Sequence, residues 1–291
     1  MKPPKLRLRL GSRKRRLGLK PVRPPRKKRW AVARKLGAIS AAGAFIIPAQ
    51  AMVKGVAPKS RSRLPILFHR LTCQSLGIKV RLHGTPLPRG AVLFVSNHLS
   101  WSDIPVLGSK LAASFVSKAE VGGWGILGYL SRLDDTIYVE RQRRQAAGEQ
   151  RDAISNRLAA GGRVILFPEG TNSDGTRVLP FKSSLFSVLE GPGSEDFLVQ
   201  PVSLAYTRVN GVPVTRAMLP QLAWVGEVEL SPHIADFMRL GAITAEILVH
   251  PPLRRSDFPS RKELARVAQE IVANGYAQLM RGDYGDAARA A

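Results

Sequence analysis

Short apolar runs alternate along the chain with longer amphipathic stretches, and this alternation limits the folds that the chain can adopt. Strands are predicted at residues 78–82, 91–96, 114–117, 136–139, 164–167, 197–204 and 245–250. Helices are predicted at residues 121–133, 145–160 and 261–280. The nearly continuous apolar strands are typical of a sheet that is covered on both faces. We therefore predict an α/β domain with a mixed, largely parallel sheet flanked by helices.

Two polar motifs begin where predicted strands end. Residues 97–103 read NHLSWSD and place His98 five residues before Asp103, and no other histidine of the chain has an aspartate at this spacing. Residues 167–171 read FPEGT and bring Glu169 to the end of another strand. Ligands of open α/β sheets bind at the carboxyl ends of the strands. We therefore expect both motifs to face one crevice.

A histidine and a carboxylate at this spacing indicate base catalysis. Imidazole is the usual general base near neutral pH, and a carboxylate on its second nitrogen fixes the tautomer and stabilises the imidazolium. Two structural interpretations compete with this one. Ser100 and Asp103 also fit a capping box, in which Asp103 would only cap a helix, and His98 could be a buried histidine of the core.

The charge of the chain is concentrated at its start. The chain has 291 residues and a formal net charge of +24, and residues 1–35 hold sixteen Lys and Arg without any acidic residue. Five prolines and the density of like charge leave this arm little to bury, so we predict that residues 1–35 are disordered. Such an arm attracts a polyanion, which would be nucleic acid or an anionic membrane surface.

An uncharged segment follows the basic arm and favours the membrane. Residues 36–53 carry no charge and approach the length that a membrane-spanning helix needs, although Ala, Gly and Pro48 make the segment only moderately apolar. A span and a re-entrant helix both fit. A buried core helix and a cleavable signal, suggested by an Ala-Gln-Ala sequence at residues 49–51, are the alternatives. An anchor with this positive flank would place the flank in the cytoplasm.

The remaining chain is long enough for one core. We divide it into a membrane-associated helical segment at residues 36–75, a catalytic domain at residues 76–280 and a tail at residues 281–291. Cys73 is the only cysteine, so no intrachain disulfide can form, and we expect it to pack within an amphipathic helix. The sequence shows no pattern typical of a metal site.

Four blocks of the chain resemble, in order, the 1-acyl-sn-glycerol-3-phosphate acyltransferase family. They are the two motifs above together with residues 137–141 (IYVER) and residues 199–202 (VQPV). The resemblance covers about residues 76–210. It implies the α/β fold already predicted, docked on a membrane, and a reaction that moves a fatty acyl group from a thioester to the hydroxyl of a lysolipid.

The resemblance also implies roles for single residues. His98 and Asp103 would be catalytic, and Pro201 would shape the region of the acyl donor. The acceptor would be bound by Arg141, Glu169, Gly170 and Thr171. No cofactor is implied, because acyl-coenzyme A or an acylated acyl carrier protein enters as a substrate.

The chain departs from the family pattern where a phosphate would be bound. Asn172 stands where a basic residue often follows the threonine, and Ser183 and Ser184 follow Lys182 where another basic residue and a glycine are common. Fewer cations favour a headgroup other than a phosphomonoester. In this respect the chain is similar to the lyso-ornithine lipid acyltransferases of the same superfamily.

We therefore expect a lysolipid O-acyltransferase of membrane lipid biosynthesis on the cytoplasmic face of the cell membrane. An acyltransferase with another acceptor, such as a lipid A precursor, is one alternative. The other is a basic membrane-associated or nucleic-acid-binding protein without catalysis. Nucleic acid is the weaker partner, because aromatic residues make up only 7% of the chain and the basic arm offers only Trp30 for base stacking.

Overall fold

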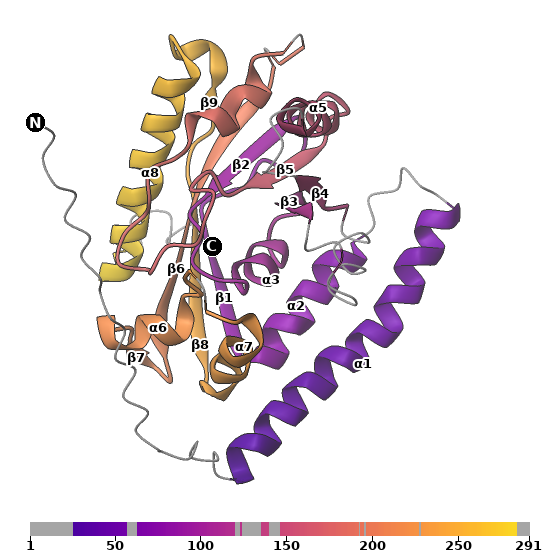
Figure 1. The fold of residues 1–291 in the computed structure, drawn as a ribbon, viewed down its shortest axis with the longest axis vertical. Coiled ribbons are helices and arrows are strands. Elements are labelled where there is room, and N and C mark those ends of the chain that lie inside the picture. The colour runs from indigo at the N-terminus through magenta and orange to yellow at the C-terminus, as the bar shows by residue number, and fades with distance from the viewer. Residues whose placement is uncertain are drawn as a thin grey trace, which may run out of the picture.

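The computed structural model describes residues 26–56, 63–119, 123, 135–139, 146–191, 193–194, 196–226 and 228–283. In this part of the chain a mixed sheet lies between helices (Figure 1), as the sequence predicted. The strands are β1 (Ile78–His83), β2 (Val92–Ser96), β3 (Ser114–Lys118), β4 (Ile137–Val139), β5 (Arg163–Leu166), β6 (Leu198–Val209), β7 (Val212–Pro213), β8 (Ile243–Val249) and β9 (Leu253–Arg254).

The helices are α1 (Arg26–Val56), α2 (Leu64–Leu76), α3 (Asp103–Gly108), α5 (Ala146–Ala159), α6 (Leu219–Leu222), α7 (Leu230–Arg239) and α8 (Arg261–Arg281). Short 3-10 helices are η2 (Ser183–Leu189), η3 (Arg216–Met218) and η4 (Arg255–Asp257). The predicted helix at residues 121–133 lies, apart from residue 123, outside the described residues.

The strand order β1-β8-β6-β2-β5-β3-β4 puts β2 between β5 and β6. These three strands are parallel, whereas β8 runs antiparallel to β6, which makes the sheet mixed. The carboxyl ends of β2 and β5 therefore open at the same edge of the sheet. Both sequence motifs start there.

The sheet is buried on both faces because alternate residues of each strand point to opposite sides. In β2, Leu93 and Val95 belong to a core with α5, η2 and α8. Val92 and Phe94 belong to a second core that includes residues of α2 and α3. This two-sided burial explains why the sequence of β2 is apolar at nearly every position.

The prediction that residues 1–35 are disordered was wrong for the last ten of them. Helix α1 begins at Arg26, directly after Pro24 and Pro25 in the sequence, and continues through Pro48 to Val56. Lys and Arg are good helix formers, and the Lys35 ammonium donates to the carbonyls of Leu76 (2.8 Å) and Leu240 (3.2 Å). This basic stretch is therefore ordered by tertiary contacts that the sequence does not display. Residues 1–25 lie outside the described part of the chain.

Helices α1 and α2 pack side by side at one edge of the molecule, on the opposite side of the sheet from α8 (Figure 1). Five large side chains of α1 are nevertheless exposed, namely Trp30, Leu36, Phe45, Met52 and Val56. The stretch Trp30–Val53 is long and apolar enough to cross a membrane, and only 11% of its most apolar window is buried by the protein. Cys73 is buried in α2, as predicted.

The segment between β6 and β8 was not predicted from the sequence. It contains α6 and α7, and α7 packs against α1 and α6. His233, Phe237 and Met238 lie buried on one side of α7. The four-residue spacing of His233 and Phe237 is a helical signal that could have located α7.

Candidate active site

The two motifs meet at the edge of the sheet where β2 and β5 end, as expected. The backbone N–H of His98 donates to Oε1 of Glu169 at 2.8 Å. The first motif is also fastened to β6, because the Asn97 amide donates to the carbonyl of Leu204 (2.8 Å) and accepts from its N–H (2.9 Å). The loop after β2 is thus held by both neighbouring strands.

His98 and Asp103 form a hydrogen-bonded pair. Nδ1 of His98 lies 2.8 Å from Oδ2 of Asp103, and the Asp103 side chain is fully buried whereas 18% of the His98 side chain is exposed. An ionised carboxylate only accepts hydrogen bonds, so the proton of a neutral imidazole resides on Nδ1. Nε2 then carries a lone pair, and no described residue forms a hydrogen bond with it. This is the state that a general base requires.

The helix-capping alternative for Asp103 is correct in part. Asp103 is the first residue of α3, and its Oδ2 accepts from the N–H groups of Leu99 (2.6 Å) and Ser100 (2.8 Å). The Ser100 hydroxyl makes no reciprocal bond. Asp103 therefore orders the helix start and holds the imidazole with the same oxygen.

Phe167 fixes the plane of the imidazole. Its ring stacks on His98 with centroids 4.0 Å apart and an interplanar angle of 14°. The ring of Phe115 stacks in turn on Phe167, with centroids 6.5 Å apart. Rotation of the His98 ring would break the stack and the bond to Asp103 together, so the ring is held in one orientation.

Glu169 joins the two motifs rather than pointing into solvent. It is buried, and its Oε2 accepts from the N–H of Leu179 at 3.0 Å while Oε1 holds His98. Burial, together with a smaller contribution from the Asp103 charge, raises the pKa of Glu169 to about 7 against the lowering effect of both backbone donors. The backbone position of His98 thus depends on a carboxyl group that titrates near neutrality.

Gly170 allows a close turn next to a lysine. Its φ of +70° lies in the left-handed region, and a Cβ there would be 2.7 Å from Nζ of Lys182. The N–H of Lys182 donates to the carbonyl of Pro168 at 2.9 Å, which holds this lysine against the motif. Lys182 and Thr171 are both exposed. The structure therefore places one ammonium and one hydroxyl at the rim of the second motif.

The structure describes one of the two further site residues that the sequence predicted. Pro201 is buried in β6, opposite Val95 of β2. Arg141 lies outside the described residues. Sequence reasoning gave no role to Lys182, although this lysine follows the second motif in the sequence. It also missed Tyr206, whose hydroxyl donates to Oδ1 of Asp103 at 2.8 Å. Tyr206 is 103 residues from Asp103, and no local pattern connects them.

A family model described as Acyltransferase matches residues 79–205, which include both motifs. A lyso-ornithine lipid O-acyltransferase of Brucella abortus (strain 2308) is 39% identical over 241 residues, which are 81% of this chain and 90% of that protein. The chain belongs to this acyltransferase family. The acyltransferase carries the His98–Asp103 pair at the end of a central parallel strand.

Two further comparisons give a similar sequence and a similar fold. A 1-acyl-sn-glycerol-3-phosphate acyltransferase of Neisseria gonorrhoeae is 32% identical over 176 residues, covering 60% of this chain and 66% of that one. The crystal structure of the 1-acyl-sn-glycerophosphate acyltransferase PlsC of Thermotoga maritima has the same fold, with a TM-score of 0.56. That comparison covers 87% of this chain and 96% of the other at 22% identity.

The raised pKa of Glu169 predicts a pH-dependent stability. At a pH between the ordinary pKa of 4.5 and the folded value of about 7, Glu169 keeps its proton in the folded protein and releases it in the unfolded chain. The contribution of Glu169 to stability is therefore complete below the ordinary pKa and is lost as the pH rises through about 7. In Glu169→Gln this titration is absent, so the Tm of the wild type minus that of the variant should fall between about pH 5 and about pH 8.

Thermal unfolding of both proteins in detergent, followed by circular dichroism, measures this difference. Glu229→Gln is the matched control, because the exposed Glu229 side chain stays in water in both states. A difference between wild type and Glu169→Gln that does not change with pH would show that Glu169 does not titrate in this range.

Proposed function

We propose that this protein is a lysolipid O-acyltransferase in which His98 is the general base. Nε2 of His98 takes the proton of the acceptor hydroxyl, and the oxygen attacks the carbonyl carbon of an acyl thioester. The tetrahedral intermediate then expels the thiolate, which takes the proton back from the imidazolium. The observation that supports this mechanism is the 2.8 Å bond from Nδ1 to the buried Asp103, which leaves the Nε2 lone pair available.

For the acceptor we propose a lyso-ornithine lipid. Its headgroup carries a carboxylate, and the exposed ammonium of Lys182 beside Gly170 is suited to pair with one. Asn172 adds no second cation there, which disfavours a doubly charged phosphomonoester. Four relatives at 34–39% identity bear the name lyso-ornithine lipid O-acyltransferase. Lysophosphatidate, the second candidate, is favoured by the similarity to the Neisseria protein.

The remaining site residues are assigned as parts of this proposal. Gly170 and Thr171 would contact the acceptor directly, as would Arg141, whereas Glu169 would act on the acceptor site by holding the backbone of His98. Pro201 would shape the donor region from within β6. The donor would be an acyl thioester of coenzyme A or of acyl carrier protein, with no further cofactor.

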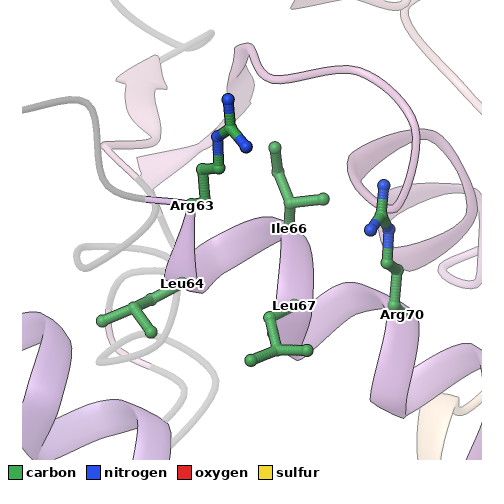
Figure 2. A pocket seen from close by; sticks show the side chains of 5 residues that line it. All are labelled: Arg63, Leu64, Ile66, Leu67 and Arg70. Atoms are coloured by element: carbon green, nitrogen blue, oxygen red, sulfur yellow. The ribbon is translucent and has the colours of Figure 1, made fainter.

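We propose that α1 and α2 hold the protein on the cytoplasmic face of the cell membrane. The exposed side chains of α1 would enter the bilayer. A cavity of about 450 Å³ along α2 is lined by Arg63, Leu64, Ile66, Leu67 and Arg70. Figure 2 shows both arginines on the same side of α2 with Ile66 between them, an arrangement that suits the boundary between headgroups and acyl chains.

The reaction and its acceptor can be tested together. Membranes carrying the protein are incubated with acyl-coenzyme A or acylated carrier protein and with either lyso-ornithine lipid or lysophosphatidate, and products are resolved by mass spectrometry. We expect diacylated ornithine lipid as the main product. His98→Ala should reduce turnover at least about 100-fold, and Asp103→Asn nearly as much, because both disable the base. A folded His98→Ala protein with near-normal turnover would refute the mechanism, and a preference for lysophosphatidate would refute the acceptor.

Lys182 should affect binding of the acceptor more than the chemical step. Lys182→Ala is expected to raise KM for lyso-ornithine lipid about tenfold with kcat little changed, because a charged contact common to the ground state and the transition state is removed. Initial rates at varied acceptor concentration in mixed micelles give both constants. Lys262→Ala, at an exposed lysine at the start of α8, is the matched control. Equal constants for the two variants would remove Lys182 from the acceptor site.

Membrane attachment should have two components that differ in their response to salt. Deletion of residues 1–25, which carry ten Lys and Arg, should weaken binding to anionic vesicles and make the remaining binding less sensitive to salt, because charge attraction is screened within about 8–10 Å and apolar insertion is not. Deletion of residues 1–56 also removes α1 and should release much of the protein. Flotation with anionic and neutral vesicles at low and high salt measures both. A full-length protein that floats with neither would refute the anchor and leave nucleic acid as the partner of the arm.

A further inference from the structure

Asp103 has a second buried partner besides His98. The hydroxyl of Tyr206 donates to Oδ1 of Asp103 at 2.8 Å, and the same hydroxyl lies 2.7 Å from Oγ of Ser102. Tyr206 and Ser102 are both buried. Oδ2 of Asp103 already holds His98 and two backbone N–H groups, whereas Oδ1 accepts from Tyr206.

The direction of each hydrogen bond in this chain follows from the carboxylate. Because Asp103 can only accept, the single proton of the Tyr206 hydroxyl is committed to Oδ1. The Ser102 hydroxyl must then donate to the oxygen of Tyr206. Burial, together with the Asp103 charge, raises the pKa of Tyr206 well above its ordinary value, so the phenol stays protonated and remains a donor. The order Ser102 to Tyr206 to Asp103 is therefore unique, with His98 donating to the opposite oxygen.

The position of Tyr206 is set by β6 and not by the catalytic loop. Tyr206 stands two residues after Leu204, whose backbone binds the side chain of Asn97 at the start of the first motif. Its ring meets Phe237 of α7 edge to face, with centroids 6.5 Å apart. Strand β6 thus forms hydrogen bonds with the loop at Asn97, through Leu204, and with the Asp103 carboxylate, through Tyr206. Tyr206 also lies one residue beyond the part of the chain that the family model matches.

We propose that Tyr206 is a positioning residue for acyl transfer, an inference that rests on the proposed function of the His98–Asp103 pair. Its hydroxyl prevents the Asp103 carboxylate from rotating about the Cβ–Cγ bond and so keeps Oδ2 directed at Nδ1 of His98. Tyr206 does not contact substrate. Its loss should therefore reduce kcat and leave KM for either substrate nearly unchanged.

Tyr206→Phe tests this, because it removes the hydroxyl and keeps the ring that packs on Phe237. We expect kcat to fall about tenfold, the usual scale for loss of a hydrogen bond to a charged group. Tyr276→Phe is the matched control. Tyr276 is also buried, and its hydroxyl donates to the carbonyl of Gly175 rather than to Asp103. This control should lower Tm comparably yet keep kcat within about twofold of the wild type.

A second measurement reports on the imidazole directly. In protein labelled with ¹⁵N in its histidine rings, the His98 signals, assigned by their absence in His98→Ala, should show one tautomer with the proton on Nδ1. Tyr206→Phe should mix the tautomers or broaden these signals, and Tyr276→Phe should not. This measurement needs no substrate, so it decides the role of Tyr206 even if the wild type acylates none of the lysolipids and the proposed function fails.

Two results would overturn the proposal. One is a folded Tyr206→Phe protein with unchanged kcat and an unchanged His98 spectrum. The other is the same loss of kcat in both tyrosine variants, which would reveal a purely structural effect. If Tyr206→Phe does not fold, Ser102→Ala takes its place, since it leaves the phenol but removes its donor. That variant should lower kcat about threefold with KM unchanged, and unchanged kinetics would again refute the proposal.

Discussion

The buried carboxylate of Asp103 is the interaction on which the site depends. It accepts four hydrogen bonds, from the imidazole of His98, two backbone N–H groups and the hydroxyl of Tyr206. A buried charge is tolerated only when its oxygens are satisfied in this way. These bonds therefore link the turn after β2, the start of α3 and the orientation of the His98 ring.

The surroundings of His98 restrict it from three directions. Asp103 holds Nδ1, Phe167 stacks on the ring, and Glu169 holds the backbone N–H. Two of these groups come from the loop after β5, so the two motifs are one structural unit. This arrangement gives the base a fixed tautomer and plane before any substrate arrives, which is the geometry that acyl transfer to a hydroxyl requires.

The proposed membrane face of the molecule, formed by α1 and α2, has a different character. The exposed apolar side chains of α1 and the two arginines along α2 have few partners within the described protein. Lys35 of α1, in contrast, donates to the carbonyl of Leu76 at the end of α2. A surface of this kind is suited to a bilayer boundary. Helix α1 packs against α2, and α2 packs against α3. These contacts connect the proposed membrane face with the helix that starts at Asp103.

The sequence by itself determined the class of fold and the pairing of His98 with Asp103. Two-sided apolar strands can only be buried between helices, and the spacing of five residues lets His98 and Asp103 meet within one turn of chain, so both predictions relied on local patterns. Tertiary structure decided the rest. Lys35 is held by carbonyls that are distant in the sequence, and burial of Glu169 against His98 depends on the pairing of β2 with β5. Tyr206 reaches Asp103 only because β6 lies beside β2, and strand order is a long-range property that no local pattern encodes.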